Sequence, residues 1–178
     1  TGELASGLTG KGRMEEPEII LSSVINFFSK GSKFSNSTVL VTSGPTFEPI
    51  DPVRFIGNHS SGKMGSSIAE SFAQQGAKVI FITGPARFLP SHENIETISV
   101  RTAEEMYIET TEHFSSVDIA VMAAAVADYT PTSVSLSKMK RESDDISIKL
   151  KPTKDIAASL GKIKSKNQLL VGFALETD

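Results

Sequence analysis

Two short apolar runs, TVLVTS at residues 38–43 and KVIFIT at residues 78–83, decide the fold class together with the segment between them. Each run is brief and rich in β-branched residues, which is typical of a strand buried on both faces of a parallel sheet. Between them, GKMGSSIAESFAQQG at residues 62–76 carries apolar side chains at intervals of four residues, which predicts an amphipathic helix. The order strand, helix, strand predicts an α/β fold with a parallel sheet.

The same alternation continues toward the C-terminus. Further strands are predicted at 95–100, 117–123 and 169–174, and further helices at 103–114 and 153–163. We therefore predict a Rossmann-like α/β domain, with a mainly parallel sheet and helices on both faces. In such sheets, ligands bind beyond the carboxyl ends of the strands, so we expect the site to be built from the loops that follow them.

Several shorter signals refine this outline. Thr102 and Glu105 form the pattern of a capping box at the start of a helix. Between the strands at 38–43 and 78–83, a long loop is expected up to about residue 62. Residues 130–150 are predicted to form a flap or hairpin, because Ile146, Ile148 and Leu150 alternate with polar residues.

The N-terminal segment differs in composition from the rest. Residues 1–14 are rich in glycine and small polar residues, which is typical of a tail or linker. A helix is then predicted from Glu15, Glu16 and Pro17, with acids and proline in its first turn, to an end near Gly31.

Composition excludes several classes of function. The chain has 178 residues with 18 basic and 21 acidic side chains, and its formal net charge of −3 provides no general positive field for nucleic acid or anionic membranes. The absence of cysteine excludes disulfides, thiolate zinc sites and a cysteine nucleophile. His59, His92 and His113 are too far apart for a helical zinc site, so we expect no metal-ligand set. No apolar run reaches the roughly 20 residues of a membrane helix, and we expect a cytoplasmic protein.

The segment GNHSSGKM at residues 57–64 approaches the phosphate loop of nucleotide triphosphatases. Met64 stands where that loop needs a hydroxyl for Mg²⁺, so we reject this class. Glycines and serines directly before a helix can still cradle a phosphate or carboxylate with their N–H groups. An ordinary capped helix after a polar loop is the other interpretation, and both remain open from the residues alone.

Three further segments have a functional and a structural interpretation. Prolines stiffen EPIDPVRF at 48–55, so Arg54 is either a phosphate ligand or a surface arginine. The segment AAAVADY at 123–129 also has two interpretations. Its small residues and Asp128 could contact a flat ligand, or the small residues could pack tightly against a helix that Asp128 caps. The basic run KMKR at 138–141 is either a solvated surface or a cover for a triphosphate.

Read together in order, GPTFEPIDPVRFIGNHSSGKMG, AAAVADY, SKMK and GFALETD resemble phosphopantothenoylcysteine synthetase, also called phosphopantothenate–cysteine ligase. The resemblance covers about residues 36–178. GKGRMEEPEI, at 10–19, resembles the closing motif of the flavin-dependent phosphopantothenoylcysteine decarboxylase that many bacteria fuse upstream. The resemblance implies that residues 1–35 are a linker and remnant of that decarboxylase. It also implies a synthetase domain truncated at its C-terminus, because the family continues beyond GFALETD.

The resemblance implies a reaction in coenzyme A biosynthesis. CTP and Mg²⁺ activate the carboxylate of 4′-phosphopantothenate as an acyl-cytidylate, and the amino group of cysteine then displaces CMP. FMN belongs only to the upstream decarboxylase module. The family forms homodimers whose active site borrows residues from the partner chain, and the full-length protein can form higher oligomers.

The resemblance also implies roles for particular residues. Asn58 and Lys138 are the catalytic pair: Asn58 processes the acyl-nucleotide, and Lys138, on the flap, helps to form it. The substrate-binding residues are Arg54, Asn58, Ala124 and Ala125. The nucleotide-binding residues are Gly44, Ser60, Ser61, Gly62, Met64, Ala124, Asp128, Lys138 and Phe173.

Two other functions remain as alternatives. An NAD(P)-dependent oxidoreductase would share the fold, but no G-x-G-x-x-G follows the first strand and no acidic residue closes the second at Thr83. A nucleotide-binding assembly module, inactive in this fragment, is the non-enzymatic alternative. Calorimetry with CTP, ATP and NADPH separates these possibilities.

Overall fold

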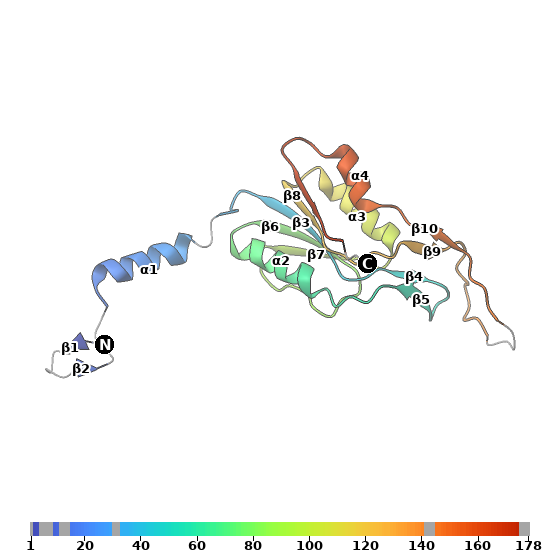
Figure 1. Ribbon diagram of the computed structural model, residues 1–178, viewed down its shortest axis with the longest axis horizontal. Helices are drawn as coiled ribbons and strands as arrows, with labels where there is room; N and C mark the ends of the chain where they lie inside the picture. Colours follow the sequence, from blue (N-terminus) through green and yellow to red (C-terminus); the bar gives the residue numbers. More distant parts are fainter. Residues whose placement is uncertain (1, 4–8, 11–14, 30–32, 141–144, 175–178) are drawn as a thin grey trace.

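The computed structural model of the protein describes residues 2–3, 9–10, 15–29, 33–140 and 145–174. Strands β1 (Gly2–Glu3) and β2 (Thr9–Gly10) pair antiparallel, and helix α1 (Pro17–Ser29) stands apart from the rest (Figure 1). Helix α1 begins at the proline that the sequence marks as its first turn. Gly31, where that helix was predicted to end, lies outside the described residues, as does most of the predicted tail at 1–14.

The centre of the fold is a five-stranded parallel sheet in the order β11-β8-β3-β6-β7. Its strands are β3 (Thr38–Ser43), β6 (Lys78–Thr83), β7 (Ile95–Ser99), β8 (Ile119–Met122) and β11 (Leu169–Gly172). Strand β3 lies in the middle and is buried at five of its six positions, as its continuous apolar run predicts. All five strands predicted for the sheet are present: β3 and β6 match their predicted bounds, and the ends of the other three differ by at most two residues.

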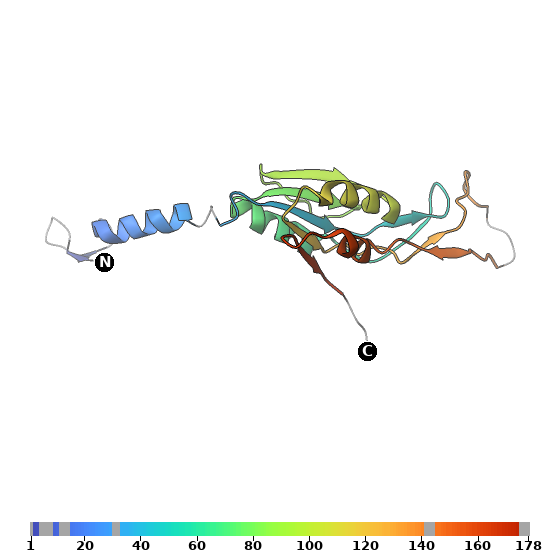
Figure 2. The same ribbon diagram turned by 90° about the horizontal axis from the view of Figure 1, so that it is seen from above.

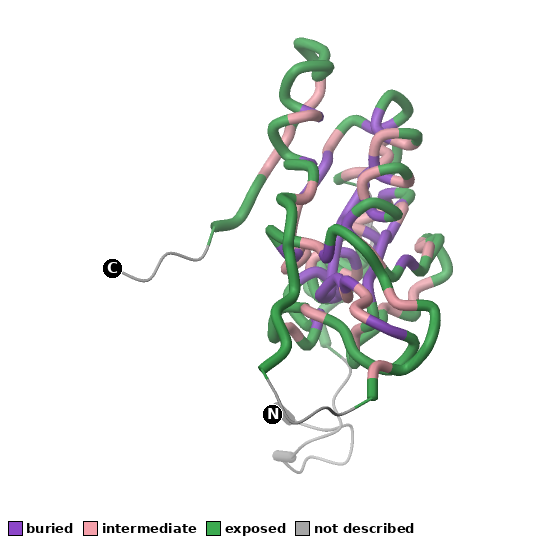
Figure 3. The backbone as a smooth tube through the Cα atoms, turned by 90° about the vertical axis from the view of Figure 1, so that its right-hand side faces the viewer, coloured by how far each residue is buried: buried purple, intermediate pink, exposed green. Residues whose placement is uncertain are grey.

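Helices cover both faces of this sheet (Figure 2). Helix α2 (Lys63–Gln74) packs on one face through Ala69 and Ala73. Helices α3 (Ala103–Phe114) and α4 (Ile156–Ile163) pack on the other, where Met106, Phe114 and Leu160 join the core. Figure 3 shows that the buried residues gather along the central strands. This arrangement confirms the predicted Rossmann-like α/β class.

Local signals at the helix ends are mostly confirmed. The Thr102 side chain accepts a hydrogen bond from Glu105 N, which completes the predicted capping box of α3. Helix α4, however, begins at Ile156 rather than at 153. The Thr153 N–H donates instead to Asp128 O at 2.9 Å, and Asp155 caps the helix by accepting from Ala158 N at 2.8 Å. The segment before Asp155 is thereby held beside Asp128, in the connection that follows β8.

Two small hairpins extend from the edge of the sheet at which the strands end. Strand β4 (Phe47–Pro49) pairs with β5 (Phe55–Gly57), and β9 (Tyr129–Pro131) pairs with β10 (Leu150–Pro152). The first hairpin replaces the long loop expected there, because the Phe47 and Phe55 rings stack with their centroids 3.8 Å apart.

The second hairpin forms the base of the predicted flap. The predicted strand through Ile146 and Ile148 is absent. The pairing of β9 with β10 ends where Leu150 lies opposite Pro131, and the last backbone bond next to it runs from Thr132 N to Lys149 O. Beyond it the flap turns away and Ser135 N donates to Ile50 O at 2.9 Å. None of the described helices has the length and apolar character needed to cross a membrane.

Candidate functional site

The largest described cavity, of about 960 Å³, lies at the edge of the sheet where β8 and β11 end. The loop at 58–65 forms one wall, and the segment at 123–126 that follows β8 forms the other. Asp128 and the residues after β11, Phe173 and Ala174, complete the lining. The cavity thus occupies the position where parallel α/β sheets bind ligands.

The loop at 58–65 is fixed by contacts with the buried end of β3 and with the loop that follows β6. The Ser43 hydroxyl, at the end of β3, donates to Gly62 O at 3.0 Å, and Gly62 has φ of 75°, a left-handed conformation that favours glycine. Gly65 packs so closely on Ser43 that a Cβ would lie 2.4 Å from its Oγ. The loop carbonyl of Ser61 accepts from the N–H groups of Arg87 and Phe88 at 3.2 and 3.1 Å.

This geometry presents the N-terminus of α2 to the cavity. Gly62 is the N-cap residue and has no side chain to satisfy the first N–H groups of the helix. Among the described residues, no acceptor bonds to the N–H groups of Met64 and Gly65, while Lys63 N donates weakly to Ser61 Oγ at 3.4 Å. Unpaired N–H groups together with the helix dipole favour an anion. No side chain caps this helix, and the anion cradle stays a prediction.

Asn58 connects the two walls of the cavity. Its Nδ2 atom donates to Val126 O at 2.9 Å and lies 3.5 Å from Ala125 O. The side chain nevertheless belongs to an exposed residue that lines the cavity. A primary amide carries two N–H donors, and both have an acceptor here. The short bond to Val126 O orients the group, and the long bond to Ala125 O is the one that a ligand oxygen would replace.

The opposite wall is held by buried hydroxyl groups from the β3 end of the sheet. Thr42 Oγ1 accepts from Ala124 N at 3.3 Å, and Thr46 Oγ1 accepts from Ala127 N at 2.9 Å. Ala125 N donates to Gly44 O at 2.8 Å. The sequence singles out the small residues of this wall but not Thr42, Ser43 or Thr46, whose roles depend on contacts made only in the folded chain.

A second cavity of about 590 Å³ adjoins the first. The two share the side chains of Ala124, Val126, Asp128, Phe173 and Ala174. The second is completed by Thr42, Met122, Gly172 and residues 153–157. Sequence reasoning missed 153–157, although TKD before an apolar helix carries the signature of an N-cap in Asp155.

Nine of the predicted site residues line the larger cavity. They are Asn58, Ser60, Ser61, Gly62, Met64, Ala124, Ala125, Asp128 and Phe173. The structure adds His59, Lys63, Gly65, Ala123, Val126 and Ala174. Three predicted residues do not line it: Gly44, Arg54 and Lys138. Gly44, with φ of 72°, instead accepts a hydrogen bond from Ala125 N through its carbonyl oxygen.

Arg54 and Lys138 lie together at the flap rather than in the cavity. The Arg54 Nη1 atom forms an ion pair with Asp51 Oδ2 at 3.3 Å, and its Nη2 donates to Met139 O at 3.2 Å. Lys138 is exposed, next to Met139 in the chain. Within one chain, the predicted residues therefore form two groups.

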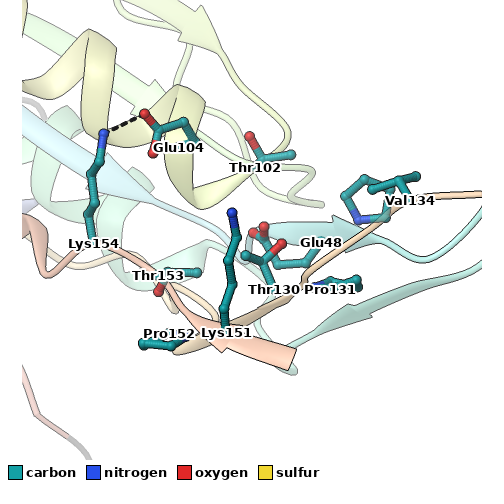
Figure 4. A pocket seen from close by; sticks show the side chains of 11 residues that line it. Glu48, Thr102, Glu104, Thr130, Pro131, Val134, Lys151, Pro152, Thr153 and Lys154 are labelled. Atoms are coloured by element: carbon teal, nitrogen blue, oxygen red, sulfur yellow. Dashed lines mark hydrogen bonds and ion pairs between the residues drawn. The ribbon is translucent and has the colours of Figure 1, made fainter. Parts of the chain in front are cut away.

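A further cavity of about 510 Å³ lies between the β9–β10 hairpin and the start of α3 (Figure 4). The buried Glu48 carboxylate accepts from Ala103 N at 2.8 Å, and Lys154 pairs with Glu104 at 2.6 Å. Lys151 extends into this space from β10. None of the predicted site residues lines this cavity. Across the described part of the chain, no three metal-ligating side chains cluster.

Comparison with known proteins identifies the family. The profile of the DNA/pantothenate metabolism flavoprotein C-terminal domain matches residues 34–178. The chain belongs to this family. The resemblance drawn from the sequence motifs is thereby confirmed at the level of the family.

Named relatives extend this assignment. A protein of an unknown prokaryotic organism, named cysteine/cysteine sulfinic acid decarboxylase, is 56% identical over 100% of this chain and 51% of its own length. The coenzyme A biosynthesis bifunctional protein CoaBC of Haemophilus influenzae is 46% identical over 99% of this chain and 44% of its own length. The chain therefore spans about half the length of the curated relatives it matches.

A solved structure of the C-terminal domain of coenzyme A biosynthesis bifunctional protein CoaBC shares the fold. It is 41% identical, with a TM-score of 0.69, and the likeness covers 80% of this chain and 66% of that one. The central parallel sheet and its helices are common to this family domain.

Proposed function

We propose that this family domain is the ligase that joins 4′-phosphopantothenate to cysteine, through an acyl-cytidylate formed from CTP. The observation that carries the proposal is the convergence of the α2 N-terminus, Asn58 and Asp128 on one cavity beyond the strand ends. The names of the CoaBC relatives, which place them in coenzyme A biosynthesis, support the same assignment.

The two adjoining cavities suit the two parts of a nucleotide. Asp128 and Phe173 line both, so a nucleoside in the smaller cavity would lie against the Phe173 ring and beside the Asp128 carboxylate. Its phosphates would then extend toward the N–H groups of Met64 and Gly65 at the start of α2. The Phe173 side chain is 55% accessible, so its ring is open to contact with a nucleoside.

The reaction then proceeds in two balanced steps. A carboxylate oxygen of 4′-phosphopantothenate attacks the α-phosphorus of CTP, and pyrophosphate leaves. The neutral amino group of cysteine next attacks the acyl carbon, CMP leaves with the electrons of the broken C–O bond, and the new amide nitrogen releases a proton to water. In this second step the Asn58 amide donates to the oxygen that develops negative charge, without itself gaining or losing a proton.

The cavity offers one carboxylate, Asp128, among the described residues that line it. Mg²⁺ in such sites is held by one or two carboxylates and by the phosphates of the substrate, so this lining fits a metal ion that arrives with CTP. The ion supplies charge neutralisation at the phosphate oxygens. We assign FMN, and decarboxylase chemistry, to the part of longer relatives that this chain does not span.

We further propose that two copies of the chain complete each site. Arg54 and Lys138 lie outside the cavity of their own chain, on hairpins that expose many apolar side chains. These are Val53, Phe55, Tyr129, Val134, Leu136, Ile146, Ile148 and Leu150. An apolar surface of this kind favours a symmetric contact between copies. In that homodimer, Arg54 would bind phosphopantothenate and Lys138 the phosphates in the partner's cavity.

The N-terminal helix fits a different module. Helix α1 exposes Ile19, Leu21 and Ile25, which are 50%, 59% and 53% accessible. A helix that is apolar on several sides is stable only when buried in a core. This supports assigning residues 1–35 to a linker and a remnant of the decarboxylase, and 36–178 to the synthetase domain.

Pyrophosphate release tests the proposal. With CTP, Mg²⁺ and 4′-phosphopantothenate, the protein should release pyrophosphate, and addition of cysteine should yield CMP and the amide product. Calorimetry in parallel should show CTP binding more tightly than ATP or NADPH. Preferential binding of NADPH would support an oxidoreductase instead. CTP binding without pyrophosphate release would support the inactive nucleotide-binding module.

A further inference from the structure

One buried carboxylate joins the flap to the β4–β5 hairpin. The side chain of Asp51 is 0% exposed. Its Oδ1 atom accepts from the N–H groups of Val53 and Arg54, both at 2.8 Å. Its Oδ2 atom accepts from Met139 N at 3.1 Å and from the Arg54 guanidinium at 3.3 Å. One oxygen thus shapes the turn, and the other binds a flap residue 88 positions away.

The contacts of the turn enclose Lys138 on both sides. Met139 is held twice, by Asp51 at its N–H and by Arg54 at its carbonyl. On the other side, Ser135 N donates to Ile50 O at 2.9 Å. No ion pair among the described residues uses the Lys138 ammonium. The flap backbone is therefore fixed while the lysine head group stays available to a ligand.

We propose that Asp51 is a positioning residue, which sets the place of Lys138 by holding the backbone of Met139. This inference deepens the proposed function and depends on it for the role of Lys138. A buried acceptor with four donors fixes geometry more firmly than an exposed ion pair, because each lost contact would leave a donor unsatisfied. No sequence motif places these residues together, since Asp51 and Met139 meet only in the folded chain.

The chemistry of the two oxygens makes the test selective. In Asp51→Asn, the amide oxygen can still accept from Val53 and Arg54, so the turn is kept. The amide NH₂ would then face Met139 N–H and the guanidinium, which are both donors. This substitution therefore releases the flap without unfolding the hairpin. Asp118→Asn is the matched control, because Asp118 Oδ2 also accepts a backbone N–H, from Thr38 at 2.8 Å.

Hydrogen exchange by mass spectrometry on the 178-residue chain tests the contact without any substrate. In Asp51→Asn, amides of residues 135–140 should exchange at least tenfold faster than in the unmodified chain, whereas those of β3 and β6 should not change. Asp118→Asn should leave 135–140 unchanged. Unchanged exchange at 135–140 in Asp51→Asn, or equal acceleration throughout the domain, would overturn the proposal.

Pyrophosphate release from CTP and 4′-phosphopantothenate tests whether Asp51 acts through Lys138. The kcat of Asp51→Asn should fall at least tenfold, and the double variant with Lys138→Gln should be no slower than Lys138→Gln alone. Losses that multiply in the double variant would overturn the positioning role. If the unmodified chain itself releases no pyrophosphate, the proposed function fails, and the exchange result alone decides whether Asp51 holds the flap.

Discussion

The two walls of the main cavity and the flap are held in different ways. The loop at 58–65 and the segment at 123–126 are bonded to buried groups at the end of β3, in the centre of the sheet. The flap is bonded to the outer turn at 50–54 through Ile50 O, the Arg54 guanidinium and the Asp51 carboxylate, which also pairs with that guanidinium. The cavity walls therefore move only if the core moves, whereas the flap can be released by changing one side chain. A fixed amide and helix terminus are suited to charge stabilisation, and a separately tethered ammonium is suited to closing over a ligand.

Removal of the fixed amide should have the largest effect. Asn58→Ala should slow product formation by about 10²–10³-fold, the usual effect of losing one oxyanion donor. Pyrophosphate release should stay close to normal, because the first step does not use this donor. A quenched-flow assay of both products measures the two steps. Asn94→Ala, at an exposed turn, is the control, and an equal loss in both steps would contradict the assignment.

The flap lysine should affect the other step. Lys138→Gln should reduce pyrophosphate release by about tenfold or more, because a positive charge near the phosphates is lost. Thermal unfolding should not change, since the side chain is exposed. Lys149→Gln, another exposed lysine between β9 and β10, should behave like the unmodified protein. A normal pyrophosphate burst in Lys138→Gln would show that Lys138 has no role in forming the acyl-cytidylate.

Mixing two variants that are each slow in product formation tests whether the flap serves the partner's cavity. In a mixed dimer of Asn58→Ala with Lys138→Gln, one cavity would keep its amide and receive an intact lysine from the other copy. About a quarter of the unmodified activity should therefore return after random exchange of subunits. If the lysine served its own cavity, mixing would restore nothing.

Close packing beneath the cavity wall should appear as a stability effect. Gly65→Ala would place a Cβ 2.4 Å from Ser43 Oγ and should lower the free energy of unfolding by about 1–3 kcal/mol. Gly161→Ala is the matched control, because nothing lies within 4 Å of its added Cβ. As a helix residue it should raise stability by about 0.5–1 kcal/mol. Urea unfolding measures both changes, and equal effects at the two sites would argue against a tightly packed wall.

The smallest expected effect is the response of the flap anchor to pH. Burial raises the pKa of Asp51, but the N–H groups of Val53, Arg54 and Met139 and the Arg54 guanidinium together hold it below its usual value. Its stabilising contribution is therefore complete above the unfolded pKa of about 3.9 and is lost as the pH falls through the lower folded pKa. Urea unfolding between pH 2 and 6 should be less pH-dependent in Asp51→Asn. If the free energy of unfolding depended on pH in the same way in Asp51→Asn and in the unmodified protein, Asp51 would not be a source of the pH dependence.

The sheet could be predicted because its strands, apart from β7 (IETIS), are short and mainly apolar, and the order of strands and helices determines a parallel topology. The β4–β5 hairpin could not, since strands of three residues are too short to carry a periodic signal. In the candidate site, the residues at 58–64 and 123–128 stand in recognisable motifs, and the structure brings them together. Thr46 and Asp51 carry no such signal, because their importance comes from partners 81 and 88 residues away.

Strand β3 ends in Thr42 and Ser43, and Thr46 follows three residues later; all three carry hydroxyl groups and are almost inaccessible to water. Each hydroxyl bonds to a main-chain atom of one cavity wall. Both walls are therefore attached to the same end of the central strand. A displacement of this strand would carry the two walls in the same direction and preserve the gap between them. Side chains on either wall can therefore be exchanged in evolution while the spacing that a ligand meets stays constant.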